Sequence, residues 1–255
     1  MYLLIDIGNT AIKFANYDGQ EINHFLTLPS QNLIIEKHLL QKINAAFNRI
    51  GITWTMIKLI CLSSVRPMWD GVIRDLASNH HLAFYQLKKN LVLDDFTINV
   101  PNPRNLGADL LAAAYASYHE FNKNDSVVIN MGTATTITMV KNHQFEGTVI
   151  MPGLATASEA LFSRAQLLQQ FEISYEDAYI GKNTKQAINI GLVKGHGLAI
   201  RALVDEIVVH LKNPIIVITG GNSYHFEQLL SNYLFDKLLL FKGLVYALHH
   251  NNLIK

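Results

Sequence analysis

The chain has 255 residues, of which 49% are hydrophobic and 16% charged, and its formal net charge is +1. This length can bury the core of one large domain or two smaller ones. The balanced charge, without a lysine–arginine cluster, makes nucleic acid and anionic membranes unexpected partners. Because Cys61 is the only cysteine, and neither a basic leader nor an apolar run of about 20 residues is present, we expect a soluble cytoplasmic protein.

Strand and helix patterns alternate along most of the chain, which indicates an α/β fold. The eleven histidines lack the spacing of a structural zinc site, so none is expected. The predicted strands cover residues 2–6, 11–17, 59–63, 127–130, 135–140 and 215–219. The predicted helices cover residues 33–50, 69–80, 106–121, 156–168, 184–211 and 223–233.

Two segments about half a chain apart resemble each other. Residues 4–14 read LIDIGNTAIKF, and residues 128–139 read VINMGTATTITM. Each has an apolar strand, then Asp or Asn, then a turn containing glycine, then a second apolar strand. This repeat predicts two related α/β domains that face each other across a cleft, where ligands tend to bind.

The first of these turns carries several groups that suit a phosphate. Gly8 lets the backbone approach a ligand closely, and successive N–H groups of a tight turn can bind an anion. Thr10 adds a hydroxyl, Lys13 a positive charge, and Asp6 a ligand for Mg²⁺. An ordinary hairpin turn is the better explanation of one such segment, but the repetition of the segment favours phosphate binding. The spacing fits neither a Walker A loop nor a dinucleotide fingerprint.

The segment NLGADLLAAAYASYHE, residues 105–120, predicts a helix with Asn105 as its N-cap. Gly107 then leaves room in the first turn, and Asp109 lies near the positive end of the helix. An acidic residue there can simply complement the helix dipole. It can equally orient a substrate hydroxyl and accept its proton. The residues of this segment alone leave both interpretations open.

Three further segments combine turns with helix starts. In VIMPGLATASEAL, residues 149–161, Thr156 or Ser158 could cap a helix. In IGKNTKQ, residues 180–186, Asn183 or Thr184 opens a long helix. The double glycine of IIVITGGNS, residues 215–223, can let an adenosine approach the backbone, or can serve a sharp strand-to-helix connection.

In combination these motifs resemble the type III pantothenate kinases, the Bvg accessory factor family, within the acetate and sugar kinase/Hsp70/actin superfamily. The resemblance implies an actin-like ATPase fold with two duplicated ribonuclease-H-like domains, at residues 1–115 and 116–255, and a cleft between them. Its motifs are DIGNT (6–10), SSVRP (63–67), NPRNLGAD (102–109), MGTATT (131–136), EGTVIMPGL (146–154), GKNT (181–184) and TGG (219–221).

The resemblance further implies ATP-dependent phosphorylation of pantothenate to 4′-phosphopantothenate, the first step of coenzyme A biosynthesis. It implies ATP with Mg²⁺ as cofactor, a monovalent cation (K⁺ or NH₄⁺) beside the phosphates, and a homodimer. The implied proton acceptor is Asp109, and Asp6 would act on Mg²⁺ through the phosphates. The implied nucleotide-binding residues are Asp6, Ile7, Gly8, Asn9, Thr10, Ala11, Ile12, Lys13 and Thr133. The implied pantothenate-binding residues are Val100, Gly107, Ala108, Asp109, Leu110 and, from the partner subunit, Thr184.

The chain departs from the family pattern at three positions. Leu110 stands where the family has arginine, Asn130 where it has an aspartate that binds the monovalent cation, and Val100 where it often has tyrosine. Asn130 keeps a carbonyl oxygen but no charge, so we expect a shifted or lost potassium dependence. The departures leave two alternatives: a catalytically weakened member with a regulatory or binding role, like the Bvg accessory factors, or a kinase for another small alcohol.

Overall fold

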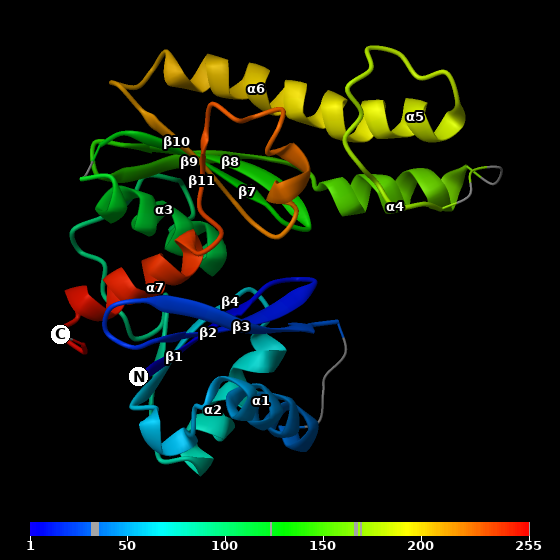
Figure 1. The fold of residues 1–255 in the computed structure, drawn as a ribbon. Helices are drawn as coiled ribbons and strands as arrows, with labels where there is room; N and C mark the ends of the chain where they lie inside the picture. Colours follow the sequence, from blue (N-terminus) through cyan, green and yellow to red (C-terminus); the bar gives the residue numbers. More distant parts are fainter. Residues whose placement is uncertain (32–35, 123, 166–167, 169, 255) are drawn as a thin grey trace. The chain divides into compact units, whose positions relative to one another are not determined.

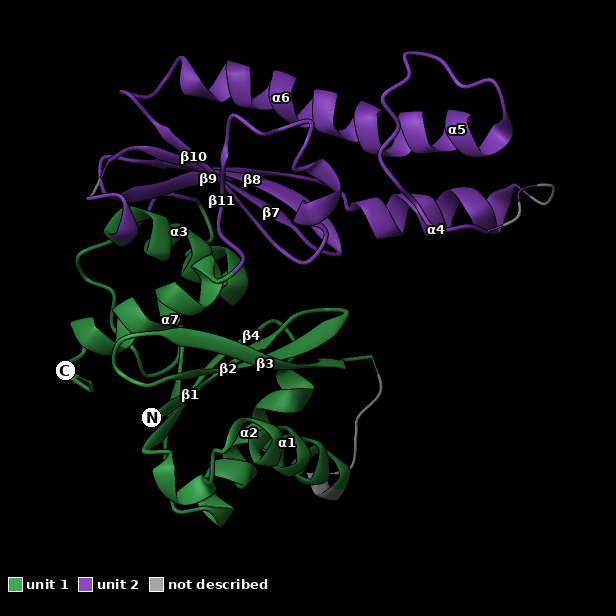
Figure 2. Ribbon diagram, viewed as in Figure 1, with its two compact units in different colours: residues 1–97, 101–119, 238–255 green, residues 98–100, 120–237 purple. Residues whose placement is uncertain are grey.

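The computed structural model describes the whole chain except residues 32–35, 123, 166–167, 169 and 255. The chain forms two compact units (Figure 2). The first comprises Met1–Thr97, Pro101–His119 and Leu238–Lys255, and the second comprises Ile98–Val100 and Glu120–Lys237. The division at residues 115 and 116 stays a prediction of domain boundaries. It differs from these units mainly at the C-terminus, because the last helix packs with the first unit.

The first unit is built on a five-stranded sheet with the order β3-β2-β1-β4-β5. Strands β1 to β3 are antiparallel, whereas β4 runs parallel to β1 and β5 parallel to β4. A strand that returns in parallel needs a crossover, which here is helical. The strands are β1 (Tyr2–Ile7), β2 (Ala11–Tyr17), β3 (Ile22–Pro29), β4 (Leu59–Ser64) and β5 (Ala83–Gln86).

Helices cover both faces of this first sheet (Figure 1). On one face α1 (Glu36–Ile50) and α2 (Pro67–Asn79) enclose a core that includes Phe14, Phe47 and Trp69, each at most 1% exposed. On the other face α7 (Leu239–His250) contacts β1 and β4. Helix α3 (Ala108–Glu120) crosses α7 where Gly243 meets the Ala112 backbone, and a Cβ at position 243 would overlap with the Ala112 carbonyl. The glycine therefore permits this close helix contact.

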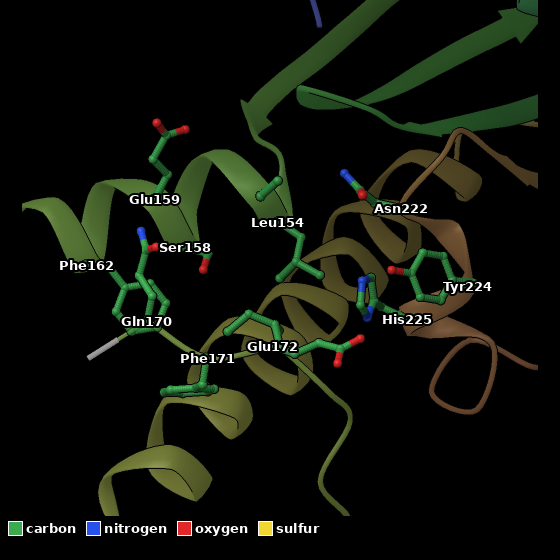
Figure 3. Close-up of a pocket in the computed structure, with 12 residues that line it drawn as sticks. Leu154, Ser158, Glu159, Phe162, Gln170, Phe171, Glu172, Asn222, Tyr224 and His225 are labelled. Carbon is green, nitrogen blue, oxygen red and sulfur yellow. The ribbon is translucent and has the colours of Figure 1, made fainter. Parts of the chain in front are cut away.

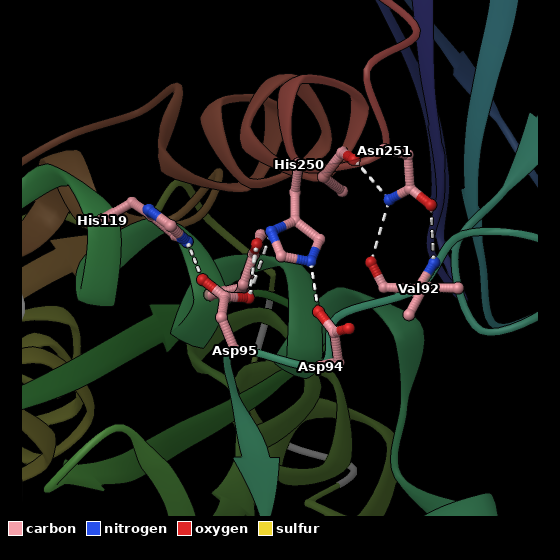
Figure 4. A network of polar contacts seen from close by, with 8 residues as sticks. Val92, Asp94, Asp95, His119, His250 and Asn251 are labelled. Carbon is pink, nitrogen blue, oxygen red and sulfur yellow. Dashed lines mark hydrogen bonds and ion pairs between the residues drawn. The ribbon is translucent and has the colours of Figure 1, made fainter.

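A polar network joins the end of α7 to the segment before β6 (Thr97–Ile98) (Figure 4). His250 Nε2 lies 2.6 Å from Asp94 Oδ1, and His250 Nδ1 lies 3.6 Å from Asp95 Oδ1. Asp95 also contacts α3, through Tyr115 Oη at 2.9 Å and His119 Nε2 at 3.1 Å. Ligand atoms of the two aspartates and His250 lie within 4.8 Å of one another, close enough for a metal ion. The contacts between these residues explain their arrangement and attach the C-terminal helix to the first unit.

The second unit has a six-stranded sheet with the order β11-β10-β7-β8-β9-β6. The helical segments include α4 and a continuous run formed by α5, a π-helical turn at Ile190–Lys194 and α6. The strands are β6 (Thr97–Ile98), β7 (Ser126–Met131), β8 (Ala134–Lys141), β9 (Gln144–Pro152), β10 (Ile215–Thr219) and β11 (Leu234–Phe235). The helices are α4 (Leu154–Arg164), α5 (Thr184–Asn189) and α6 (Gly195–Val208).

The two sheets repeat one topology, which confirms the predicted duplication of an α/β unit. The order β9-β8-β7-β10-β11 in the second sheet corresponds, strand by strand, to the order β3-β2-β1-β4-β5 in the first. Strand β6 is an additional strand at the edge of the second sheet. The register agrees as well: Ala11 pairs with Pro29 in the first sheet, and Ala134 pairs with Pro152 in the second. Each hairpin loop and the end of each third strand therefore occupy equivalent positions in the two units.

The helical run at Thr184–Val208 corrects the expectation that the chain has no apolar run long enough to span a membrane. With 25 residues it is long and apolar enough to cross a membrane, by length and composition only. The buried core helix of a soluble protein passes the same test. Val193, Ile200 and Val204 have no exposed surface and belong to the core of the second unit, and α6 contacts β7 and β8. These contacts bury one face of the run in the second unit, while 33% of its most apolar window is buried as a whole.

The predicted strands are confirmed with small shifts at their ends, as are most of the predicted helices. The helix predicted at 223–233 is wrong, because only Ser223–Phe226 forms a 3₁₀ turn and turns follow. The first three residues of the helix predicted at 33–50 lie outside the described residues. Residues 166 and 167 of the helix predicted at 156–168 also lie outside them. Strands β3, β5, β6, β9 and β11 and helix α7 were not predicted.

Candidate active site

The loop between β1 and β2 has its carbonyl groups fixed by residues from elsewhere in the first unit. Ser30 Oγ donates to the Gly8 carbonyl at 2.8 Å, and the Ser30 N–H donates to the Thr10 carbonyl at 3.0 Å. Arg66 Nη1 donates to the Asn9 carbonyl at 3.1 Å. In a trans peptide the N–H points away from the C=O of the same plane. The N–H groups of Asn9 and Thr10 therefore point away from these anchors, as an anion-binding turn requires.

The loop between β7 and β8 repeats this arrangement within the second unit. Asn222 Nδ2 donates to the Gly132 carbonyl at 3.2 Å. The Thr133 carbonyl accepts from the Gly153 N–H at 3.0 Å and from Thr156 Oγ1 at 2.6 Å. By the same peptide geometry, the N–H of Thr133 and that of the next residue point away from these donors. The two glycine turns predicted from sequence are thus similar in backbone organisation as well as in composition.

Asp6 is a buried carboxylic acid at the end of β1, with 6% of its surface exposed. It lies opposite Lys13 on β2 and beside Ser63 on β4, whose Oγ donates to Asp6 Oδ1 at 3.3 Å. Burial raises the pKa of Asp6 to about 7, the Lys13 ammonium opposes the rise, and the nearby Asp109 adds to it. Because burial disfavours the ionised form of Asp6, a cation that approaches this carboxyl group would stabilise its negative charge.

Asp109 lies in the first turn of α3, and its carboxylate turns back on the start of the helix. Asp109 Oδ1 accepts the Leu110 N–H at 2.9 Å, which complements the positive end of the helix. A Cβ at Gly107 would overlap with Asp109 Oδ1, so glycine at this position makes room for the carboxylate. The predicted Asn105 cap is wrong. Asn105 belongs to a 3₁₀ turn, and the Gly107 carbonyl accepts the first helical bond, from Leu111 N at 3.1 Å.

Asp6, Lys13 and Asp109 form one group of interacting charges, to which Lys88 also belongs. Burial raises the pKa of Asp109, while its backbone hydrogen bonds and the charges of Lys13 and Lys88 oppose the rise. The cluster therefore joins two carboxyl groups with raised pKa values to two ammonium groups, all within the first unit. Such a set can receive a proton and neutralise phosphate charge. Sequence reasoning missed Lys88, which lies far from the other three along the chain.

The second unit contains a cavity of about 450 Å³ beside the second hairpin (Figure 3). The start of α4 lines one side, and the segment after β10 lines another with Asn222, which also anchors the loop. The predicted double glycine, Gly220 and Gly221, directly follows β10 and precedes Asn222. Gly220 has φ +99°, and a Cβ there would overlap with the Met131 backbone, so it serves the sharp connection. Gly221 has open space around it, which leaves the adenosine interpretation as a prediction. The lining includes Leu154, Ser158, Phe162, Phe171, Tyr224 and His225.

Asn130 in the second unit corresponds to Asp6 in the first. It lies opposite Thr136 on β8 and beside Thr219 on β10, as Asp6 lies between Lys13 and Ser63. Thr136 Oγ1 is buried and has no hydrogen-bond partner among the described residues. These three side chains carry neutral oxygen atoms, which suit a monovalent cation but do not offset its charge. The donor set thus fits a weakly held ion at most.

The remaining predicted residues lie in different environments. The side chains of Ile7 and Ile12 are fully buried in the core, so only their backbone could contact a ligand. Val100 and Leu110 are half-buried, in the second and first unit respectively. Thr184 is the exposed first residue of α5.

Of the helix caps predicted from sequence, one is confirmed. Asn183 caps α5, because its Oδ1 accepts the Gln186 N–H at 2.9 Å. At α4 the cap position is Gly153, and no side chain caps the helix. Thr156 instead holds the second hairpin loop, and the cap predicted at Thr156 or Ser158 is wrong.

Comparison with solved structures confirms the actin-like ATPase fold. A Baf-family transcriptional activator from Campylobacter jejuni superposes with a TM-score of 0.62 at 22% identity, over 99% of this chain and 100% of the other. The activator of 2-hydroxyisocaproyl-CoA dehydratase from Clostridium difficile, solved with bound ADPNP, superposes with a TM-score of 0.55 at 12% identity, over 100% and 98%. These similarities concern the fold alone.

Sequence comparison identifies the family. The family model described as type III pantothenate kinase matches residues 2–206. A type III pantothenate kinase from Geobacillus kaustophilus is 30% identical over 227 residues, covering 87% of this chain and 86% of the relative. Another, from Kosmotoga olearia, is 31% identical over 258 residues, covering 96% and 94%. The chain belongs to the type III pantothenate kinase family.

Proposed function

We propose that this chain transfers the terminal phosphoryl group of ATP to the primary hydroxyl of pantothenate. The product is 4′-phosphopantothenate, and the reaction is the first step of coenzyme A biosynthesis. The observation that carries this proposal is the cluster of Asp6, Lys13 and Asp109, beside a hairpin loop whose N–H groups suit a phosphate. The family assignment makes ATP with Mg²⁺ the expected cofactor.

The roles of the residues follow from their charges. Phosphoryl transfer passes through a loose transition state, so positioning and charge neutralisation dominate. The Lys13 ammonium and the N–H groups of the first loop bind phosphate oxygens, and Thr133 contributes from the second loop. Asp6 would help to hold Mg²⁺, and the ion would supply charge neutralisation at the phosphates. Asp109 orients the acceptor hydroxyl and takes its proton late in the reaction.

Pantothenate is proposed to contact the start of α3, where Gly107, Ala108 and Leu110 flank Asp109, together with Val100. Thr184 is proposed to reach the pantothenate of a partner subunit in a homodimer. Its exposed position at the start of α5 is compatible with this role. The proposed location is the cytoplasm, where ATP and a reducing environment suit a chain with a single buried cysteine.

A coupled assay of ATP consumption tests this function. The wild type should consume ATP only when pantothenate is present, and the product should be 4′-phosphopantothenate by mass spectrometry. Asp109→Asn should lower kcat by about 10²- to 10⁴-fold while the protein stays folded, because a general base typically contributes that much. Near-full activity of this variant would remove Asp109 as proton acceptor.

The same assay decides between the proposal and its alternatives. Leu110 and Asn130 motivate both, because each carries no charge where the family pattern has one. A weakened member with a regulatory role would bind ATP in calorimetry without turning it over in the presence of pantothenate. A kinase for another small alcohol would consume ATP with a different acceptor from a panel of hydroxyl compounds.

A further inference from the structure

Lys88 lies in an ordered turn that directs its side chain toward the start of α3. It follows β5 directly after Leu87, and its φ of 67° is in the left-handed region that non-glycine residues seldom adopt. The turn is closed by Asn90, whose Oδ1 accepts the Gln86 N–H at 2.7 Å and whose Nδ2 donates to the Phe84 carbonyl at 3.2 Å. A residue kept in such a conformation is held there by its surroundings, which often happens at functional sites.

The ammonium group of Lys88 binds the backbone that leads into α3. Its Nζ donates to the Arg104 carbonyl at 2.9 Å and also to the Leu106 carbonyl. These two carbonyls lie just before Gly107, the residue that makes room for the Asp109 carboxylate. The Lys88 side chain is half-buried, and its bond to the Leu106 carbonyl is partly shielded from water, whereas its bond to the Arg104 carbonyl is exposed. Hydrogen bonds to a charged donor are stronger than those between neutral groups.

Lys88 is also a cation that acts on Asp109 from a different element. The first turn of α3 contains no basic residue, and position 110 is leucine. The charges that act on Asp109 in the described structure come from Lys13 on β2, Lys88 after β5 and Asp6 on β1. Lys88 opposes the effect of burial on this carboxyl group, as Lys13 does.

From this geometry we propose that Lys88 is a positioning residue for the reaction. It fixes the segment 104–107 through two carbonyl groups, and so holds the Asp109 carboxylate at the start of α3 in its reactive ionised form. The expected effect of Lys88 on the rate of phosphoryl transfer rests on the proposed kinase function. The structural part of the proposal, the attachment of residues 104–107, holds independently of that function.

Lys88→Met tests the proposal, because it keeps the length of the side chain and removes its charge. Lys89→Met is the matched control, since Lys89 is the neighbouring lysine and is exposed. In Lys88→Met, the amides of Asn105 and Leu106 should exchange hydrogen about 10- to 100-fold faster, the range expected when a charged hydrogen bond is lost. kcat should fall by a similar factor with little change in the KM for ATP, and the acidic limb of the pH–rate profile should shift to higher pH. Lys89→Met should leave all of these unchanged, and Lys88→Arg should restore most of the rate.

Each of the other outcomes refutes a stated part of the proposal. Unchanged exchange in Lys88→Met would show that Lys88 does not hold the segment. Faster exchange with normal kcat and pH profile would make it a structural anchor only, and would refute its role in the reaction. If the wild type shows no pantothenate-dependent ATP consumption, the proposed function fails, and the exchange measurement still decides the attachment.

A measurement on the wild type covers the case in which Lys88→Met does not fold. Acetic anhydride at limiting concentration, applied over a range of pH, separates the rate constant of each free amine from the pKa of its ammonium group, which burial lowers at Lys88. The free-amine rate constant of Lys89 should be at least about 10-fold larger than that of Lys88, because Lys88 is held at two backbone carbonyls. Peptide mass spectrometry resolves the two adjacent lysines by fragmentation. Equal free-amine rate constants would refute the geometry on which the proposal depends.

Discussion

Ser30 and Gly153 occupy the same place in the two units. Each follows directly on the proline that ends a third strand, and its N–H donates at 3.0 Å to the carbonyl of a loop threonine, Thr10 or Thr133. The backbone anchor of the hairpin loop is thus repeated, whereas the side chains around it differ. In the first unit the serine hydroxyl adds a bond to Gly8, and in the second a helix residue adds one to Thr133. The loop geometry is therefore maintained by contacts that a short sequence motif does not contain.

Ser30→Ala should loosen the first loop and weaken ATP binding. The change removes the hydroxyl that donates to the Gly8 carbonyl at 2.8 Å and leaves that carbonyl without this partner. The loss should destabilise the protein by about 1–3 kcal/mol and raise the KM for ATP severalfold, with a smaller effect on the KM for pantothenate. Steady-state kinetics and urea unfolding measure the two effects. Ser163→Ala is the control, because Ser163 makes a similar hydroxyl-to-carbonyl bond on an exposed helix surface, to Ala160. An unchanged KM for ATP would contradict a role of this anchor in binding.

Much of the fold was predictable because the central strands are continuous apolar runs. YLLIDI of β1 and SVVINM of β7 are almost fully buried, and their pattern indicates strands directly. Strand β3 lies at a sheet edge with mixed burial, so INHFLTLP shows no clear alternation. Helix α7 is apolar nearly all round because it is buried between α3 and the sheet, which removes the helical periodicity.

The candidate site was predictable where its residues share a motif. Asp6 and Lys13 pair across one hairpin, and Asp109 follows a glycine at a helix start. Arg66, Asn222 and Lys88 were missed because each comes from the end of a different strand or a following turn. Only the strand order of the sheets brings them to the loops and to α3.

Gly107→Ala should impair catalysis without unfolding the protein. The added Cβ overlaps with Asp109 Oδ1, so the carboxylate has to leave its place on the helix start. We expect kcat to fall by about 10-fold or more, since a small displacement of a catalytic group is costly. Gly71→Ala is the matched control, because Gly71 lies within α2 with open space around its Cβ position. That variant should gain up to about 1 kcal/mol of stability from helix propensity and keep its activity. Normal kcat in Gly107→Ala would show that the carboxylate position is not critical.

Asp6→Asn should make the protein more stable at alkaline pH and less active. The pKa of Asp6 is raised from 3.8 to about 7 in the folded protein, so the unfolded chain ionises first. Stability associated with this group is fully present below pH 4 and is lost as the pH rises to about 7. The loss amounts to about 4 kcal/mol. Asparagine does not ionise, so the variant's advantage in unfolding free energy should be several kcal/mol larger at pH 8 than at pH 4.

Urea unfolding at the two pH values, without nucleotide, measures this difference. Asp109 also has a raised pKa, but it is present in both proteins and largely cancels in the comparison. The activity of Asp6→Asn should fall, because the carboxylate that we propose helps to hold Mg²⁺ has lost its charge. A stability difference that does not change with pH would contradict the raised pKa of Asp6.

Potassium dependence tests the consequence of Asn130. This residue lies with Thr136 and Thr219 in the position that Asp6, Lys13 and Ser63 occupy in the first unit, and none of the three carries a charge. We expect little or no activation of the wild type by K⁺, and a clear saturable activation in Asn130→Asp, because a carboxylate at this position attracts the cation. The rate should be measured against KCl, with choline chloride holding the ionic strength constant so that screening of other charges does not change. Thr136→Val in the Asn130→Asp background should weaken the activation, since it removes the buried hydroxyl that has no other partner in the described structure. Strong activation of the wild type at low millimolar K⁺ would show that neutral oxygens suffice to hold the ion.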